Sequence, residues 1–468
     1  MTMLGRTRRV HFVGVGGAGM SGIAELLANL GYAVSGSDAR RSDVTDRLAS
    51  LGVRVFIGHD GAHVGDSDVV VMSSAIAREN PELQAARARH IPVIPRAEML
   101  AELMRLRTGI AVAGAHGKTT TTSMIALMLE RAGWDPTAII GGRLSAFGSN
   151  ARLGRGEFMV AEADESDKSF LLLSPTIAVI TNIDREHMET YGSFDRLTAA
   201  FADFANRVPF YGAVVACADD AALAGLVPAL SRRVITYGFS ESANVQGEAP
   251  VTDGQTGRCS VRYHVRGAPN GNGSGQLALA VPGVHNLQNA LAAIAVGLEL
   301  GLPFDRAAGA LAEFRGAERR YELRGRAAGV TVIDDYGHHP TEIAAVLRAA
   351  RAGTPPRLVA VFQPHRHTRT RDLLEDFGPA LGLADVVVLT DIYAAGEPAI
   401  SGVTLDALAA SMRKSVRDLR VVPKLDDVPG AVAALARPGD LVITLGAGSI
   451  GTVGDRVLAE LSAHEVRS

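Results

Sequence analysis

The residues whose types and spacing most clearly indicate a chemical role lie in a glycine-, lysine- and threonine-rich stretch at 114–120. Its sequence is Gly-Ala-His-Gly-Lys-Thr-Thr. It follows an apolar run typical of a buried strand and precedes a helical pattern. Backbone N–H groups at a helix N-terminus bind phosphate, a lysine can reach β- and γ-phosphates, and a hydroxyl can bind Mg²⁺. Lys118 and Thr119 therefore predict a nucleoside triphosphate site. The common P-loop has a glycine five positions before the glycine that precedes its lysine. Val112 occupies that position here, so the loop is shorter or differently wound.

A second glycine-rich turn, with the sequence Gly-Val-Gly-Gly-Ala-Gly, spans 14–19 and also stands between an apolar run and a helical pattern. Such a turn can hold a diphosphate at the helix N-terminus. Asp38 ends the next apolar run, at a spacing typical of the carboxylate that binds a ribose in dinucleotide folds. From these residues alone, NAD binding and a turn that serves only strand–helix packing both remain open.

Carboxylates and a histidine follow two further apolar runs. Glu162 begins the sequence Glu-Ala-Asp-Glu-Ser-Asp at a predicted strand end, where a carboxylate can reach metal ions that lie over phosphates. His187 stands in a later loop that also contains Asp184 and Glu186. Taken alone, a solvated acidic loop and a structural histidine are the simpler interpretations. The sequence Thr-Asn-Ile-Asp at 181–184 resembles a GTPase base-recognition motif, but no lysine follows its asparagine, so a GTPase is not expected.

Histidines and arginines cluster after two predicted strands in the last third of the chain, in the stretches 334–340 and 363–369. Open α/β sheets build binding sites at the carboxyl ends of their strands, and clustered histidine and arginine are unfavourable as core filling. We therefore expect a site there. The stretch 285–289, His-Asn-Leu-Gln-Asn, precedes an apolar helical run, where a helix cap at Asn286 and adenine binding are equally good interpretations.

A repeated alternation of apolar strands with helical patterns must position these motifs, and it predicts an α/β protein of three domains. Buried parallel strands are expected at 10–16, 33–38 and 68–75, then at 158–162, 177–182 and 213–217, and finally at 330–334, 358–363, 385–390 and 440–445. A charged, glycine-containing stretch at 314–325 predicts a linker. The β-type residues around Asn270 predict a hairpin or flexible loop inside the second domain.

The composition of the 468 residues limits the classes of function. With 47% hydrophobic and 21% charged residues the chain is typical of a soluble globular protein with several cores. A net charge of -3 and 5% aromatic residues argue against nucleic-acid binding. The two cysteines, Cys217 and Cys259, provide neither a disulfide framework nor a CxxC motif, which favours a reducing compartment. The apolar run 287–302 is interrupted by polar residues and glycines, so no membrane span is expected.

Taken together, the motifs resemble those of the Mur ligase family over almost the whole chain. The resemblance rests on GVGGAGMSGIA at 14–24, GAHGKTTTT at 114–122, EADESD at 162–167, HMETY at 187–191, DDYGHHPTE at 334–342, QPHRHTRT at 363–370 and DIYAAGE at 391–397. In this family the first glycine-rich domain holds a UDP-sugar, the middle domain ATP and the third domain the incoming amino acid. The resemblance therefore replaces the NAD interpretation. It implies an N-terminal Rossmann-like domain at 1–107, a central P-loop ATPase-type domain at 108–320 and a C-terminal Rossmann-like domain at 321–468.

The resemblance also implies roles for the residues at matching positions. Those expected to contact the UDP-sugar are Gly16, Gly17, Gly19, Asp38, His59 and Ser73. Those expected to hold ATP are Gly114, Ala115, His116, Gly117, Lys118, Thr119, Thr120, His285, Asn289, Arg320 and Asp335. Those expected to position the amino acid are Tyr336, His338, His365, Arg366 and Arg369. Mg²⁺ ligands are expected at Thr119, Glu162 and His187, and direct participants in catalysis at Lys118, Glu162, His187, His338 and Arg369.

Within the family, the motifs most resemble those of the member that uses ATP and Mg²⁺ to join L-alanine to the lactyl carboxylate of UDP-N-acetylmuramate, through an acyl phosphate, in peptidoglycan synthesis. This resemblance implies a cytoplasmic enzyme, with no nucleic-acid or membrane partner, that is a monomer or a weak dimer. Two alternatives remain open: a tripeptide ligase of murein recycling and a non-catalytic sensor of UDP-sugars. Later ligases of the pathway carry a carbamylated lysine, but residues 188–212 contain no lysine, so no carbamylation is expected.

Overall fold

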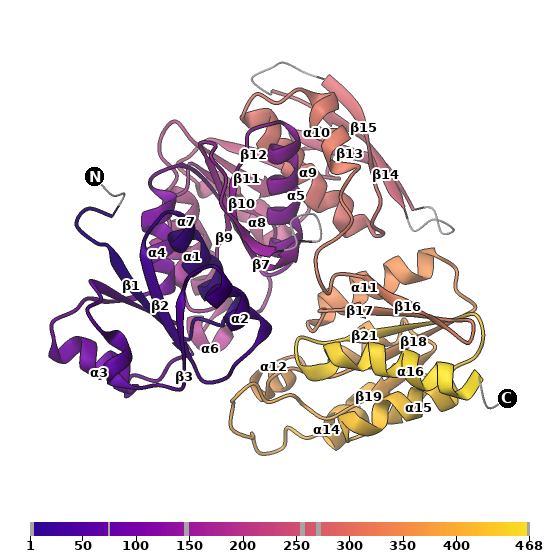
Figure 1. Ribbon diagram of the computed structural model, residues 1–468. Coiled ribbons are helices and arrows are strands. Elements are labelled where there is room, and N and C mark those ends of the chain that lie inside the picture. Colours follow the sequence, from indigo (N-terminus) through magenta and orange to yellow (C-terminus); the bar gives the residue numbers. More distant parts are fainter. Residues whose placement is uncertain (1–3, 74, 145–148, 253–257, 268–272, 466–468) are drawn as a thin grey trace. The chain divides into compact units, whose positions relative to one another are not determined.

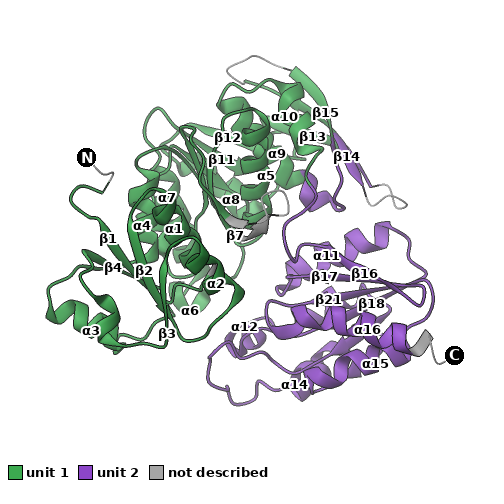
Figure 2. Ribbon diagram, in the orientation of Figure 1, with its two compact units in different colours: residues 1–248, 262–277, 288–314 green, residues 249–261, 278–287, 315–468 purple. Residues whose placement is uncertain are grey.

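The computed structural model describes residues 4–73, 75–144, 149–252, 258–267 and 273–465. In this part of the chain the strands form three sheets, of five, ten and six strands, and helices alternate with most of the strands. Figure 1 labels many of these helices and strands, and its colours follow the sequence from the N-terminus to the C-terminus. The α/β class that the sequence predicts is therefore confirmed. Contacts between residues divide the chain into two compact units, one made of residues 1–248, 262–277 and 288–314 and the other of residues 249–261, 278–287 and 315–468 (Figure 2).

The five-stranded sheet contains the first glycine-rich turn. Its order is β3-β2-β1-β4-β5, and neighbouring strands are parallel. The chain adds β2 and β3 on one side of β1 and then β4 and β5 on the other, so the strand order reverses at β1. Such a reversal point opens a crevice at the carboxyl ends of the strands. The strands are β1 (Arg9–Val13), β2 (Ala33–Asp38), β3 (Arg54–Ile57), β4 (Val69–Met72) and β5 (Val93–Pro95). The helices are α1 (Ala18–Asn29), α2 (Asp43–Ser50), α3 (Pro81–Ala88) and α4 (Arg96–Met104).

The first strand ends earlier than the sequence predicts. It was expected to continue to residue 16, but β1 stops at Val13 because Gly14 takes a φ of 83°, which lies outside the β region. The turn that follows leads directly into α1, whose N-cap is Gly17. The expected strand at 68–75 is likewise shorter, since β4 ends at Met72.

The ten-stranded sheet contains the phosphate-loop motif. Its order is β15-β14-β13-β12-β11-β10-β6-β9-β7-β8. The strands are β6 (Thr108–Ala113), β7 (Thr137–Leu144), β8 (Ser149–Arg152), β9 (Phe158–Glu162), β10 (Ile177–Ile180), β11 (Ala213–Cys217), β12 (Val234–Gly238), β13 (Val245–Thr252), β14 (Cys259–Val265) and β15 (Gly273–Leu279). The helices are α5 (Lys118–Arg131), α6 (Met188–Tyr191), α7 (Phe194–Asn206), α8 (Ala221–Leu226), α9 (Val284–Glu299) and α10 (Phe304–Leu311). The centre of the predicted hairpin or loop around Asn270 lies outside the described residues.

Parallel pairing in this sheet brings three chain segments to one edge. In β6, Ala113 pairs with Ile180 of β10, and Val112 pairs with Glu162 of β9. The residues that follow these strands therefore emerge side by side. Both β6 and β10 are fully buried over these positions, as expected for parallel strands with both faces covered.

The six-stranded sheet, of order β16-β17-β21-β18-β19-β20, forms the core of the second unit. Its strands are β16 (Glu322–Ala327), β17 (Val330–Asp335), β18 (Arg357–Phe362), β19 (Val386–Leu389), β20 (Leu419–Val421) and β21 (Asp440–Leu445). Its helices are α11 (Pro340–Ala352), α12 (His367–Asp372), α13 (Phe377–Leu381), α14 (Leu405–Met412), α15 (Val428–Leu435) and α16 (Val453–Glu465). Apolar side chains from both faces of the sheet are buried against these helices.

The prediction that residues 314–325 are all linker is wrong at its end. Strand β16 begins at Glu322 and pairs antiparallel with β17 at the sheet edge. Its residues are all partly or fully exposed, so they carry no apolar run that would have indicated a strand. In the described part of the chain, no helix combines the length and the apolar character that crossing a membrane requires.

Candidate active site

The phosphate-loop residues form a tight turn between β6 and α5. Gly114 has a φ of 134° and Gly117 a φ of 82°, and a Cβ atom at Gly114 would lie 2.0 Å from Thr181 Oγ1. Thr181 Oγ1 donates a hydrogen bond to the His116 carbonyl at 2.6 Å, and Asn182 Oδ1 accepts one from the His116 N–H at 2.8 Å. Glycine is therefore required for this close approach, and the Thr-Asn pair after β10 has a structural role in holding the loop.

Lys118, the first residue of α5, bends back over this loop. Its Nζ donates hydrogen bonds to the Gly114 carbonyl at 2.6 Å and to the Ala115 carbonyl at 3.2 Å. It also forms an ion pair with Glu165, with 2.8 Å between Nζ and Oε1. The two side chains are 19% and 3% exposed, so the pair is largely shielded from solvent. The ammonium group is thereby held at the end of the loop where phosphate oxygens would be bound.

Electrostatics keep Lys118 charged. Burial opposes its charge, but attraction and hydrogen bonding to the Glu165 carboxylate, with further attraction from Glu186, outweigh burial and raise the pKa of Lys118 above its usual value. Burial also raises the pKa of Glu165, and the positive charge of Lys118 opposes that rise. Because the two groups lie in direct contact, we regard the charged pair as the state at neutral pH. A permanent cation at this position can neutralise phosphate charge.

Three side chains near Lys118 could hold a divalent cation. Glu165, Glu186 and His187 each offer a ligand atom, and these atoms lie within 4.8 Å of one another. Glu165 Oε2 is buried and has no hydrogen-bond partner in the described part of the chain. Carboxylate oxygens are the preferred ligands of Mg²⁺, so this donor set fits the ion. His187 has a φ of 56°, a strained conformation for a non-glycine residue that is frequent at functional sites.

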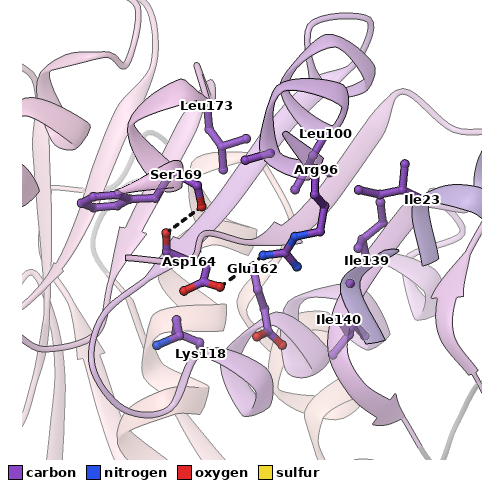
Figure 3. A pocket seen from close by; sticks show the side chains of 13 residues that line it. Ile23, Arg96, Leu100, Lys118, Ile139, Ile140, Glu162, Asp164, Ser169 and Leu173 are labelled. Carbon is purple, nitrogen blue, oxygen red and sulfur yellow. Dashed lines mark hydrogen bonds and ion pairs between the residues drawn. The ribbon is translucent and has the colours of Figure 1, made fainter. Parts of the chain in front are cut away.

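Among the described residues, Glu162 is not one of the three ligands of this group. Glu162, the predicted ligand at the end of β9, lines a cavity of about 240 Å³ together with Lys118 and Asp164. Figure 3 shows these side chains with Arg96, which reaches them from α4. Thr119 is partly buried in the first turn of α5, next to Lys118. The sequence thus indicated His187 and the acidic run but assigned no metal-binding role to Glu165 or Glu186.

Asn289 and His285 have different surroundings. A Cβ atom at Gly117 would lie 2.7 Å from Asn289 Oδ1, so Asn289 lies beside the phosphate loop. His285 belongs to the second unit. Burial, with repulsion from Arg320, lowers the pKa of His285 to about 4, against an opposing attraction from Glu342. His285 is therefore neutral at pH 7 and can offer both a donor and an acceptor to a base edge.

The residues predicted to bind the UDP-sugar follow the carboxyl ends of β1, β2, β3 and β4. Asp38 Oδ2 accepts a hydrogen bond from the Gly16 N–H at 2.8 Å, and a Cβ atom at Gly16 would lie equally close to that oxygen. Ser73 lies within 3.4 Å of the position that a Cβ atom at Gly14 would take. His59 Nδ1 is 3.1 Å from Ser37 Oγ. The first glycine-rich turn and its predicted partners therefore meet at one edge of the sheet.

A buried carboxylate, Glu82, connects residues of this sheet by hydrogen bonds. Its oxygens lie 2.7 Å from His11 Nε2, 2.8 Å from Ser37 Oγ and 2.9 Å from His59 Nδ1. Burial opposes the charge of Glu82, but the hydrogen bonds from His11, Ser37 and His59 outweigh it and lower the pKa of Glu82. The side chains of Glu82 and His11 are completely buried. Glu82 was missed in the sequence because its partners on β1, on β2 and after β3 are distant along the chain.

In the second unit, Asp335 forms hydrogen bonds to the backbone beside residues predicted to bind ATP and the amino acid. Its carboxylate accepts hydrogen bonds from the Tyr321 N–H and the Gly337 N–H, each at 2.7 Å. Burial raises the pKa of Asp335 to about 6, against the attraction of Arg320. The Arg320 guanidinium lies 5.1 Å from the centre of the Tyr336 ring, a cation–π contact.

The predicted amino-acid residues come together after β17 and β18. The His338 ring contacts Tyr336 and His365 edge to face, with centroids 5.4 and 5.5 Å apart. His365 Nδ1 lies 3.3 Å from Arg369 Nη1. Arg366 has a φ of 71° and lies 3.8 Å from Glu397, so its charge is partly balanced. The structure therefore gathers the two distant motifs into one cluster.

Comparisons with known proteins cover almost the whole chain. Family models match three segments, described as the Mur ligase family catalytic domain at residues 9–108, the Mur ligase middle domain at 112–297 and the Mur ligase glutamate ligase domain at 319–448. A UDP-N-acetylmuramate–L-alanine ligase of Geobacter sp. (strain M21) is 52% identical over 98% of this chain and 99% of its own length. The corresponding ligase of Anaeromyxobacter dehalogenans (strain 2CP-1) is 52% identical over 97% of this chain and 98% of its own length.

Solved structures agree with these sequence comparisons. The UDP-N-acetylmuramate–alanine ligase of Thermotoga maritima has a TM-score of 0.81 and 29% identity, covering 98% of this chain and all of the other. A murein peptide ligase of Psychrobacter arcticus has a TM-score of 0.73 and 25% identity, covering 97% of this chain and 98% of the other. The predicted three-domain α/β fold, with Rossmann-like domains on either side of a P-loop ATPase-type domain, is confirmed. The chain belongs to the Mur ligase family.

Proposed function

We propose that this chain joins L-alanine to the lactyl carboxylate of UDP-N-acetylmuramate at the expense of ATP, giving ADP, phosphate and UDP-N-acetylmuramoyl-L-alanine in peptidoglycan synthesis. The observation that carries the proposal is a single cavity lined by Gly19 of the first glycine-rich turn and by Lys118 and Glu162 of the phosphate-loop sheet. A sugar nucleotide bound at the turn would extend toward the residues that bind the γ-phosphate. The relatives at 52% identity, named as L-alanine ligases, support the same reaction.

The proposed sites follow the domains of the family. UDP-N-acetylmuramate binds at the crevice of the five-stranded sheet, where Gly16, Gly17, Asp38, His59 and Ser73 contact it. ATP binds along the loop 114–120, with Lys118 on the β- and γ-phosphates. Asn289 and His285 read the adenine, and Arg320 and Asp335 complete the nucleotide site. L-alanine binds to the cluster of the second unit, which comprises Tyr336, His338, His365, Arg366 and Arg369. The domain limits that we propose are 1–107, 108–320 and 321–468.

The reaction begins with activation of the carboxylate. A lactyl carboxylate oxygen attacks the γ-phosphorus of ATP, the bond to ADP breaks, and an acyl phosphate forms. The amine of L-alanine, after losing a proton, attacks the acyl carbon, and the C–O bond to phosphate breaks to leave an amide. The first step brings a carboxylate toward a polyanion. Lys118 lowers that repulsion because its charge is fixed beside the loop before substrate arrives.

Mg²⁺ supplies further neutralisation of phosphate charge when it is bound. We propose Glu165, Glu186 and His187 as residues that would hold one ion, and Thr119 and Glu162 as residues that would hold another. Glu165 contacts Lys118 and also belongs to the metal-binding group, so its carboxylate couples the two cationic elements of the site. We further propose a cytoplasmic enzyme that acts as a monomer or a weak dimer.

An assay of acceptor specificity tests the proposal against its two alternatives. The protein is incubated with ATP, Mg²⁺ and UDP-N-acetylmuramate, and with L-alanine, with the murein tripeptide or with no acceptor, while phosphate release and product mass are followed. We expect phosphate and a product one alanyl residue heavier with L-alanine. A product with the tripeptide alone would establish the recycling ligase. UDP-sugar binding without any product would establish a sensor.

A further inference from the structure

The cavity shared by the two sheets of the first unit has a polar end and an apolar wall. Arg96, Lys118, Glu162 and Asp164 form the polar end (Figure 3). The apolar wall includes Ile23, Leu100, Ile139 and Leu173. At about 240 Å³ the cavity can hold a short carbon chain with one polar group. None of the functions assigned above uses Arg96.

The Arg96 side chain lies against Gly19 and Asp164. Arg96 is the first residue of α4, and its Nη2 lies 3.2 Å from Asp164 Oδ2. A Cβ atom at Gly19 would lie 1.8 Å from Arg96 Nη1, so the guanidinium occupies space that only a glycine at position 19 leaves free. In the described residues Asp164 is the one hydrogen-bond partner of this guanidinium, through Nη2 alone. Because arginine has five N–H donors, most of them remain available to a ligand.

We propose that this cavity receives the lactyl end of the sugar substrate and that Arg96 binds its carboxylate. The inference rests on the proposed function and names a binding residue for it. The guanidinium presents a planar fork that matches a carboxylate, and Asp164 fixes the direction of that fork. The lactyl methyl group would contact the apolar wall, and Arg96 would hold the carboxylate in the cavity that Lys118 also lines.

Charge explains why a cation is needed at this point. Glu162 and Asp164 line the same cavity, and two carboxylates would repel a third. Lys118 is paired with Glu165 at 2.8 Å, so Arg96 is the cation whose N–H groups can donate hydrogen bonds to a substrate carboxylate without breaking an ion pair of the phosphate loop. Arg96 would therefore discriminate in favour of sugar nucleotides that carry the lactyl acid.

Two ligands that differ in the lactyl group test this inference. UDP-N-acetylglucosamine lacks the lactyl ether that UDP-N-acetylmuramate carries, so binding of both is measured by calorimetry in the wild type and in Arg96→Met. We expect the Kd for UDP-N-acetylmuramate to rise about 10- to 150-fold. The Kd for UDP-N-acetylglucosamine should not change. Arg105→Met is the matched control, because Arg105 follows the same helix with a side chain 64% exposed and paired with Glu102.

The outcomes separate this inference from the proposed function. Suppose that the wild type makes product but Arg96→Met weakens the binding of both ligands equally, or changes the binding of neither. Arg96 then has only a structural role and the inference fails. If the wild type does not bind UDP-N-acetylmuramate, the proposed function itself fails. Should Arg96→Met not fold, Arg96→Lys is measured instead. This variant keeps the positive charge but not the planar guanidinium. Weaker binding of UDP-N-acetylmuramate alone would support the inference, whereas an equal change in the Kd of both ligands would overturn it.

Discussion

Replacing Lys118 by methionine removes the one charged donor of the phosphate loop. Its Nζ makes hydrogen bonds of 2.6 and 3.2 Å to the loop carbonyls and a 2.8 Å ion pair to Glu165. Loss of one preorganised donor to transition-state charge costs about 2.7–4 kcal/mol, or 10²- to 10³-fold in kcat. Lys118→Met should therefore lower kcat by at least about 10²-fold. Binding of UDP-N-acetylmuramate should be largely spared, since most of the contacts that we propose for it lie on the five-stranded sheet.

The assay must separate chemistry from folding, because Lys118→Met leaves the carboxylate of Glu165 buried without its cation. Breaking a buried pair from one side costs about 3–5 kcal/mol of stability. The double variant Lys118→Met/Glu165→Gln removes this charge. Its free energy of unfolding, measured by urea denaturation, should recover much of the loss, while kcat stays low. Phosphate release and calorimetric binding of UDP-N-acetylmuramate are measured on both proteins. Equal loss of turnover and sugar binding in the well-folded double variant would refute the assignment of Lys118 to the phosphates.

Four further changes test other parts of the site. His187→Ala should raise the Mg²⁺ concentration for half-maximal activity at least about tenfold, and an unchanged Mg²⁺ titration would return His187 to a structural role. Arg369→Ala should raise the KM for L-alanine about 10- to 150-fold while borohydride still traps the acyl phosphate; loss of trapping with an unchanged KM would move Arg369 to the ATP site. Glu82→Gln should lower the free energy of unfolding by about 1–3 kcal/mol in urea and weaken UDP binding through His59, whereas wild-type values for both would show that the buried hydrogen bonds are dispensable. Because the pKa of His285 falls from 6.5 in the unfolded chain to about 4, its stabilising contribution is complete above pH 6.5 and is lost as the pH falls toward 4. This loss amounts to roughly 3–4 kcal/mol at its limit, and His285→Gln should flatten that part of the pH–stability curve measured by urea denaturation.

The strands that the sequence predicted best are those buried on both faces. Phe158–Glu162, Ala213–Cys217 and Asp440–Leu445 have the expected limits, because burial on both sides requires a continuous apolar run. Strands at or near sheet edges gave no such signal. Arg54–Ile57 and Glu322–Ala327 contain only partly buried or exposed residues, so hydrogen bonding to a neighbouring strand rather than hydrophobicity defines them.

The same distinction holds for the candidate site. Motifs that are continuous along the chain, such as 114–120, could be recognised because one turn brings backbone N–H groups, a lysine and a hydroxyl together. Arg96 and Glu82 could not, since their roles arise only when the sheets form. Arg96 meets Gly19 and Asp164 across 77 and 68 positions of sequence, and nothing local distinguishes it from other surface arginines.

Transfer of an oxygen isotope from substrate to phosphate tests the central claim most directly. UDP-N-acetylmuramate labelled with ¹⁸O in its lactyl carboxylate is turned over with ATP, Mg²⁺ and L-alanine, and the released phosphate is analysed by mass spectrometry. If the carboxylate attacks the γ-phosphorus, each phosphate formed from fully labelled substrate carries one ¹⁸O atom from the carboxylate, and the amide retains the other. Unlabelled phosphate, with both ¹⁸O atoms left on the sugar nucleotide, would show that ATP is hydrolysed without activating the carboxylate and would contradict the account.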